Sequence, residues 1–117
     1  MSSRGWLIRV QDILNAIESI QSAIGTRTFE EFTDDSILLK AVLYDFVIIG
    51  EAAANIPTEI RAKATDIPWR LMADMRNVIT HEYFRVDPEI IWDTVQLNLP
   101  GLVRLLEQFL ATEQAQD

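Results

Sequence analysis

The sequence contains no cysteine, and this absence excludes several kinds of chemistry at once. Disulfides, thiolate nucleophiles and sulfur-ligated zinc sites all require cysteine. Histidine is almost as scarce, because His81 is the only one in the chain. There is also no glycine-rich phosphate loop and no glycine elbow around a nucleophilic serine. We therefore expect neither a metal site nor a cofactor.

Long apolar runs are also missing. The longest, Phe46–Gly50, is closed by Glu51 and falls far short of the roughly 20 uncharged residues that cross a bilayer. Arg9 and Asp12 interrupt the segment that follows the first five residues, so no secretory signal is predicted. We expect a cytoplasmic protein with no membrane partner.

Basic residues are few, since 10 Lys and Arg stand against 18 Asp and Glu, for a formal net charge of −8. Nucleic-acid binders usually carry a basic face, so this balance argues against such a role. A negative net charge is still compatible with nucleic-acid binding if the basic residues gather around one cleft while the acidic ones lie on distant loops and tails. An acidic surface also suits a basic protein partner. The acidic residues expected at a distance are Glu30, Glu31, Asp34, Asp35, Glu113 and Asp117.

The length and composition predict a single folded domain over residues 1–117. A chain of 117 residues is close to the commonest domain size, and 49% hydrophobic and 24% charged residues are typical of a globular protein. There is no internal repeat, low-complexity stretch or linker. One hydrophobic core is therefore expected.

Helical periodicity dominates the first half of the chain. Apolar residues recur every three or four positions over residues 6–24, and Gly25 is a plausible stop. We expect a loop over residues 25–32, then a second helix that Thr33 or Asp34 caps and that runs to about residue 55. This second helix is apolar almost all round, which marks the most buried element of a bundle. Its run Val47–Ile49 could instead be a strand, but nothing else in the chain offers it a partner.

Proline marks the elements of the second half. Pro57 ends the second helix and opens a short one through residues 59–63. Pro68 starts a third helix that runs to His81, and Pro88 starts a fourth that is expected to bend at Pro100 and to continue to about residue 110. The predicted fold is all-α, an up-and-down bundle of four long helices plus a short connecting helix.

The chemically informative segment is Arg76-Asn-Val-Ile-Thr-His81-Glu-Tyr83-Phe84. On an ideal helix Arg76 and Tyr83 share a face, whereas Arg76 and His81 diverge by roughly 140°. This divergence is tolerable if the helix loosens at its C-terminus near Thr80–His81, so that the imidazole turns into a groove beside the guanidinium. Taken alone, Arg76 could be a salt-bridging residue, His81 a surface or satisfied core residue, and Tyr83 an interface aromatic.

Three other residues have expected roles. Glu51 stands at the end of an apolar helix, where an ionised carboxylate is costly unless it is paired. Arg76 is its expected partner, and the carboxylate would then orient the guanidinium; simple exposure at a helix end is the alternative. Trp69 and Trp92 are expected to pack in the core or at a dimer interface rather than to stack on bases.

The spacing Arg76-Asn77-x-x-x-His81-x-Tyr83 resembles the Arg-x-x-x-x-His-x-Tyr motif of HepT-type proteins in the HEPN superfamily. The similarity spans roughly residues 6–110. Glu82 departs from the family pattern, in which a small residue such as glycine is more usual. Flanking segments that resemble the family in order and spacing are Ile49-Gly50-Glu51-Ala52, Ile67-Pro68-Trp69, Met75-Arg76-Asn77, Tyr83-Phe84, Val86-Asp87 and Ile91-Trp92.

The resemblance implies a HEPN-like fold and a metal-independent endoribonuclease toxin of a toxin–antitoxin pair, with RNA as substrate. Arg76 and His81 would be catalytic, with Glu51 and Asn77 in supporting roles. Tyr83 would receive AMP from a nucleotidyltransferase-fold antitoxin, which silences the toxin. Because one chain has one histidine, a mechanism with two proton transfers suggests a homodimer that brings a second His81 across a two-fold axis. The alternative is a non-catalytic helical partner that binds substrate for a nucleotidyltransferase.

Overall fold

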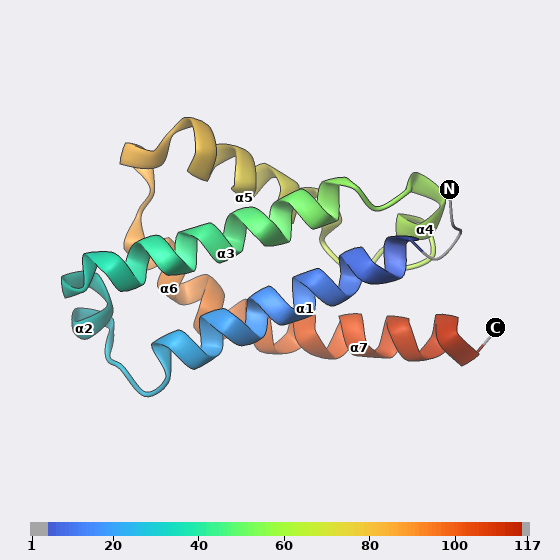
Figure 1. Cartoon of the computed structure of the whole chain (residues 1–117), viewed down its shortest axis with the longest axis horizontal. Helices are drawn as coiled ribbons and strands as arrows, with labels where there is room; N and C mark the ends of the chain where they lie inside the picture. Colours follow the sequence, from blue (N-terminus) through green and yellow to red (C-terminus); the bar gives the residue numbers. More distant parts are fainter. Residues whose placement is uncertain (1–4, 116–117) are drawn as a thin grey trace.

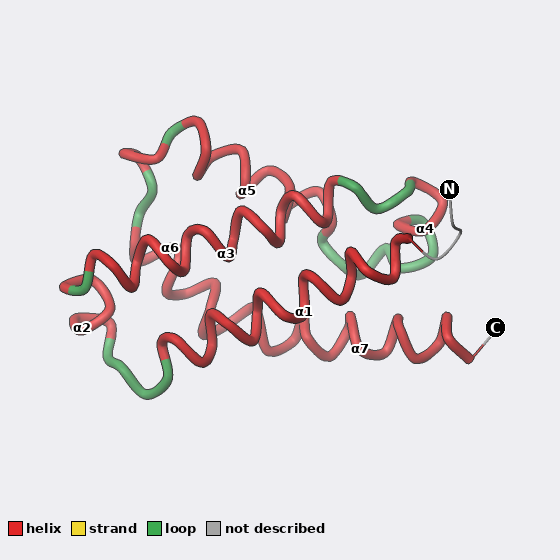
Figure 2. Tube along the Cα trace, viewed as in Figure 1, coloured by secondary structure: helices red, strands yellow, loops and turns green. Residues whose placement is uncertain are grey.

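A computed structural model describes residues 5–115, and every regular element within them is helical (Figures 1 and 2). The first five residues were considered above as a possible signal; of these, residues 1–4 lie outside the described part of the chain, as does Asp117. The predicted all-α fold is confirmed, and Val47–Ile49 is helical rather than a strand. The elements are α1 (Gly5–Ile24), α2 (Phe29–Asp34), α3 (Ser36–Ala54), α4 (Thr58–Arg61), α5 (Trp69–His81), η1 (Tyr83–Arg85), α6 (Pro88–Asp93), η2 (Thr94–Asn98) and α7 (Leu99–Ala115).

Helix α3 is the central element of the bundle, as its apolar sequence predicts. It packs against α1 on one side and against α5 on the other, and α7 packs against α1 (Figure 1). Helix α1 contributes buried residues at the predicted spacing of three or four, and burying each such aliphatic side chain stabilises the fold by about 1.5–3 kcal/mol. The buried residues of α1 and α3 include Val10, Ile13, Ile17, Ile20, Ile24, Val42, Leu43, Phe46 and Ile49.

The segment predicted as a loop before α3 contains a short helix, and this prediction was wrong in part. Helix α2 begins with a capping box: the Thr28 hydroxyl accepts from the Glu31 amide, and the Glu31 carboxylate accepts from the Thr28 amide at 2.9 Å. These hydrogen bonds from Thr28 lower the pKa of the Glu31 carboxyl. Phe32 is fully buried and anchors the helix to the core. The predicted caps Thr33 and Asp34 therefore lie inside or at the end of α2.

The caps and stops at the other helix ends largely follow the sequence. Gly25 has φ of +54°, the left-handed conformation expected of a glycine that ends a helix. Asp35, one residue after the predicted caps, accepts from the Leu38 amide at 3.0 Å and caps α3. Asp87 accepts from the Glu89 amide at 2.9 Å and has Pro88 next to it, which is the predicted cap-and-proline start of α6.

The last helix is interrupted before Pro100 rather than at it. Residues Thr94–Asn98 form a π-helical turn in which the Leu99 amide donates to the Thr94 carbonyl. Proline has no amide hydrogen and its ring crowds the carbonyl four residues earlier, which is here that of Gln96. A wider turn relieves this crowding, so the irregularity falls in the turn before Pro100. Helix α7 continues from there through the predicted Leu110 to Ala115.

No helix among the described residues is long and apolar enough to cross a membrane. Within the same part of the chain, no polar or charged residue is fully buried. Any polar site in residues 5–115 therefore opens to the surface of the bundle.

Candidate active site

The close approach of α3 and α5 places Arg76 against α3. At Gly50 a side chain would have no room: a Cβ atom there would overlap Cβ of Arg76 and would lie 2.6 Å from the carbonyl oxygen of Met72. The obstacle is backbone and a Cβ atom, which cannot rotate away. Sequence reasoning quoted Gly50 only as part of a resembling segment and gave it no role. Its signal was a glycine inside a helix of large aliphatic residues, which often marks close backbone contact.

Arg76 forms the ion pair that the sequence predicts. Its Nη1 donates to Oε2 of Glu51, and the two side chains are 25% and 56% exposed. Arg76 Nε is buried and has no acceptor among the residues described. The guanidinium is thus held through one end by the carboxylate, while the stem lies against Gly50. The pairing of Glu51 is confirmed, and its side chain is at the same time largely exposed.

His81 is the last residue of α5 and is exposed to solvent. Within residues 5–115 no hydrogen bond or ion pair joins it to Arg76. The change in backbone considered near Thr80–His81 comes one residue later: α5 stays α-helical through His81, and Glu82 has φ −133° and ψ 44°. The Glu82 amide still donates to the Val78 carbonyl, which closes the final turn.

Tyr83 lies beyond the end of α5, so the predicted shared helical face of Arg76 and Tyr83 does not exist. It begins the 3₁₀ turn η1 and its side chain is 41% exposed. Its ring packs edge-on against that of Phe84, with centroids 5.6 Å apart. Phe84 is 99% exposed, so this pair of rings projects from the end of the bundle rather than packing into it.

Of the remaining residues singled out in the sequence, one is exposed on α5 and two pack against the core. Asn77 is exposed, and its carbonyl accepts from the Thr80 hydroxyl at 3.3 Å. Trp69 is buried and its indole N–H donates to the Ala64 carbonyl at 3.1 Å. Trp92 is partly buried beside Phe32, with ring centroids 5.5 Å apart. The prediction of core packing is confirmed for Trp69 and Trp92.

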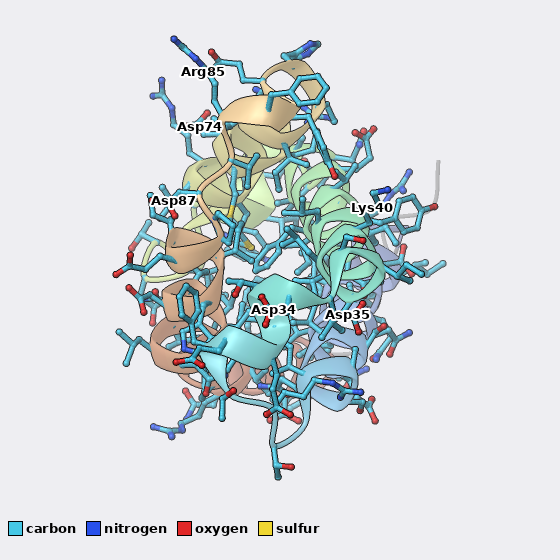
Figure 3. The ribbon with its side chains drawn as sticks, turned by 90° about the vertical axis from the view of Figure 1, so that its left-hand side faces the viewer. Asp34, Asp35, Lys40, Asp74, Arg85 and Asp87 are labelled. Atoms are coloured by element: carbon cyan, nitrogen blue, oxygen red, sulfur yellow. The ribbon has the colours of Figure 1, made fainter. Side chains whose placement is uncertain are left out.

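Charge is not distributed as the sequence analysis expected. The arginines of α5 and η1 have acidic partners: Arg70 lies 3.9 Å from Asp74, and Arg85 lies 3.2 Å from Glu82. Figure 3, which looks at this end of the molecule, shows Arg85 well apart from Asp34 and Asp35. Figure 1 likewise shows α2 apart from the end of α5, so the acidic residues of α2 do not surround the motif. Because Arg70 and Arg85 are both paired with acidic residues, they do not form a cleft of unpaired basic residues around the motif.

An apolar groove of about 900 Å³ runs between α5 and the α6–α7 arm. Its floor includes Phe46 and Ile49 of α3, and Asp74, Arg85 and Asp87 line it along one edge (Figure 3). Arg76, His81 and Tyr83 do not line it, but their neighbours do. Apolar residues that line it are Leu71, Met72, Met75, Val78, Ile79, Val86, Ile90, Ile91, Leu97, Leu102 and Leu105. We call this feature the α5–α7 groove.

The groove presents large apolar side chains to solvent. Leu71, Val78, Ile90 and Leu97 are 68%, 44%, 61% and 75% exposed. Contiguous apolar surface of this kind marks binding sites in soluble proteins. In contrast, no group of three or more His, Asp or Glu side chains in residues 5–115 is arranged to hold a metal ion.

Comparison with known proteins identifies relatives along almost the whole chain. The family described as Ribonuclease HepT-like matches residues 13–109. A candidate RNase of Caldanaerobacter subterraneus subsp. tengcongensis is 35% identical over 105 residues, which cover 90% of this chain and 94% of that protein. A probable ribonuclease HepT of Thermococcus cleftensis is 41% identical over 93 residues, which cover 80% of this chain and 84% of that protein. A candidate RNase of Methanocaldococcus jannaschii is 34% identical over 106 residues, which cover 91% of this chain and 88% of that protein.

No solved structure has a significant match to the chain. The family match covers α3, the Glu51–Arg76 pair, all of α5 and the turn that carries Tyr83. With this match and three relatives above 30% identity, the chain belongs to the HepT-like ribonuclease family.

Proposed function

We propose that the protein is an endoribonuclease that cleaves RNA by attack of a ribose 2′-oxygen on the adjacent phosphorus. The guanidinium of Arg76 stabilises the negative charge that develops on the phosphorane oxygens, and His81 transfers a proton. The observation that carries the proposal is the pair of groups on α5: an arginine fixed against α3 by Glu51, followed five residues later by the chain's single histidine, exposed at the helix end.

The chemistry fits these groups. A fixed guanidinium stabilises the transition-state charge without having to reorganise, and an imidazole transfers protons efficiently near neutral pH. The anchoring of Arg76 uses one nitrogen, so other guanidinium N–H groups are left for phosphate oxygens. Asn77 supports the site from the exposed side of α5.

We propose further that the protein works as a homodimer through the α5–α7 groove. The groove lies between α5 and the α6–α7 arm, which are the third and fourth long helices of the predicted bundle. Its exposed leucines and isoleucine give a surface that two copies could bury against each other around a two-fold axis. Val78 and Ile79 line the groove within a few residues of His81, so such a dimer would bring the two motifs to one cleft.

Control by a nucleotidyltransferase antitoxin is the proposed regulation. Tyr83 offers a hydroxyl on an exposed turn two residues after His81. Attack of that hydroxyl on the α-phosphate of ATP, with release of pyrophosphate, would leave a negatively charged phosphodiester close to the site. The attached nucleotide would compete with the RNA phosphate for Arg76.

One observation favours a second function, a non-catalytic partner that binds substrate for a nucleotidyltransferase. The net charge is −8, and the arginines nearest the motif are paired with acids. Such a partner would use the acidic surface and the groove, and it would leave RNA intact.

A cleavage assay tests the proposed function. The purified protein is incubated with a mixed RNA pool, with and without chelator, and product ends are analysed. The proposal expects cleavage in both conditions and products that end in 2′,3′-cyclic phosphate. RNA that stays intact while the protein binds a nucleotidyltransferase would support the second function instead.

A further inference from the structure

The carboxylate of Glu51 lies next to Arg76, and the proposed reaction still lacks a group that takes the proton of the 2′-hydroxyl. Transesterification at a 2′-hydroxyl needs one group to take a proton and another to give one. A single protomer has only one histidine. Among the described residues, Glu51 is the acidic group in contact with Arg76, the side chain proposed to hold the phosphate.

The geometry leaves Glu51 available for chemistry as well as for pairing. Its Oε2 accepts from Arg76, while Oε1 has no partner within residues 5–115. The side chain is 56% exposed, so a substrate can reach it. A phosphate bound to the free N–H groups of Arg76 would bring the adjacent ribose 2′-hydroxyl beside this open oxygen.

The position of the carboxylate is fixed by the helices that carry it. Gly50 precedes Glu51, and its missing side chain allows α3 to contact α5 at Arg76. The close packing of the two backbones therefore brings the residues that carry the carboxylate and the guanidinium near each other, and the ion pair joins the ends of their side chains.

We propose that Glu51 is the general base of the reaction and that His81 is the general acid, an assignment that rests on the proposed function. The 2′-hydroxyl gives its proton to Oε1 of Glu51, and the 2′-oxygen bonds to phosphorus. The bond from phosphorus to the 5′-oxygen breaks, and the imidazolium of His81 protonates that oxygen. The products are a 2′,3′-cyclic phosphate and a 5′-hydroxyl; proton exchange with water restores both side chains.

Two substrates that differ in their leaving group distinguish the general base from the general acid. In RNA the leaving 5′-oxygen needs a proton, whereas in a nucleoside 3′-(4-nitrophenyl phosphate) the phenolate leaves without one. We expect His81→Ala to lose ~100- to 10,000-fold on RNA and to lose at least tenfold less on the nitrophenyl esters of the four nucleosides. Glu51→Gln should lose activity by a similar factor on both substrates, because attack by the 2′-oxygen is common to them.

Glutamine is the informative replacement because its carbonyl still accepts from Arg76 but takes no proton at neutral pH. Glu82→Gln is the matched control, since Glu82 also pairs with an arginine, is 48% exposed, and lies at the end of α5. Its activity should stay within a few-fold of wild type. Melting temperatures measured for all three variants exclude unfolding as the cause of a loss.

Two results would overturn the assignment. Glu51→Gln that cleaves both substrates at the wild-type rate would make Glu51 a positioning residue. Equal losses of His81→Ala on both substrates would make His81, of the same or a second subunit, the base. Wild-type protein that cleaves neither substrate, or Arg76→Ala that cleaves both at the wild-type rate, would reject the proposed function itself.

Discussion

At the scale of single residues, the candidate site consists of an arginine paired with a carboxylate and an exposed histidine at the end of the same helix. The Glu51–Arg76 pair was predictable, because a carboxylate at the end of an apolar helix needs a partner and few arginines were available. The position of Tyr83 was predicted wrongly, because the shared face with Arg76 assumed an ideal helix that continues two residues beyond the predicted end at His81. Helix α5 ends at His81, so Tyr83 belongs to a separate turn.

The exposed position of Tyr83 leads to a prediction about modification. The chain has two tyrosines, and Tyr44 on α3 is 67% exposed, which makes it a matched control. After co-expression with the cognate nucleotidyltransferase, mass spectrometry should find an AMP adduct on the wild type and on Tyr44→Phe but not on Tyr83→Phe. Tyr83→Phe should keep its ribonuclease activity in the presence of the antitoxin.

An adduct that persists in Tyr83→Phe would contradict this assignment, as would an adduct lost in Tyr44→Phe. Loss of ribonuclease activity in unmodified Tyr83→Phe would give the hydroxyl a role in catalysis instead.

At the scale of helices, periodicity and caps predicted α1, α3, α5 and the start of α6. The sequence missed α2 because its signal is a short capping box at Thr28 and Glu31, without the repeated apolar pattern of a long helix. It misplaced the irregularity before α7 because proline acts on the carbonyl one turn upstream. The closeness of α3 to α5 was not predictable, since it depends on which residue of α5 meets Gly50.

This contact gives a prediction about stability. Gly50→Ala should lower the free energy of unfolding by about 1–3 kcal/mol, because the added methyl overlaps the backbone and Cβ of α5. Gly101→Ala on α7 is the control: nothing lies within 4 Å of a Cβ atom there, so the better helix propensity of alanine should leave stability unchanged or raise it by up to about 1 kcal/mol. Urea unfolding measures both.

If Gly50→Ala proved as stable as Gly101→Ala, the close packing of α3 on α5 would be refuted. A destabilised but folded Gly50→Ala should also lose ribonuclease activity, because Arg76 is displaced from Glu51.

At the scale of the whole molecule, the α5–α7 groove exposes large apolar side chains that nothing in a single chain covers among the residues described. We predict that the wild-type protein is a dimer at micromolar concentration and that Leu97→Glu, which puts a charge into the groove, is monomeric. Ile37→Glu is the control, because Ile37 is 79% exposed on α3 and does not line the groove. Sedimentation equilibrium distinguishes these states.

A monomeric wild-type protein would contradict the predicted dimer. If Ile37→Glu dissociated the dimer while Leu97→Glu stayed dimeric, the interface would lie on another face.

The all-α architecture was predictable at this scale because periodicity reports helices directly. The groove was not, because it depends on the spacing between α5 and the α6–α7 arm.

The central claim is that Arg76 and His81 make this bundle a ribonuclease, and the rate of RNA cleavage by the two alanine variants tests it most directly. His81 is exposed and Arg76 is held mainly through one ion pair, so both variants should melt close to the wild-type temperature. We predict that each nonetheless cleaves RNA ~100- to 10,000-fold more slowly than wild type. Folded variants that cleave RNA at the wild-type rate would contradict the account.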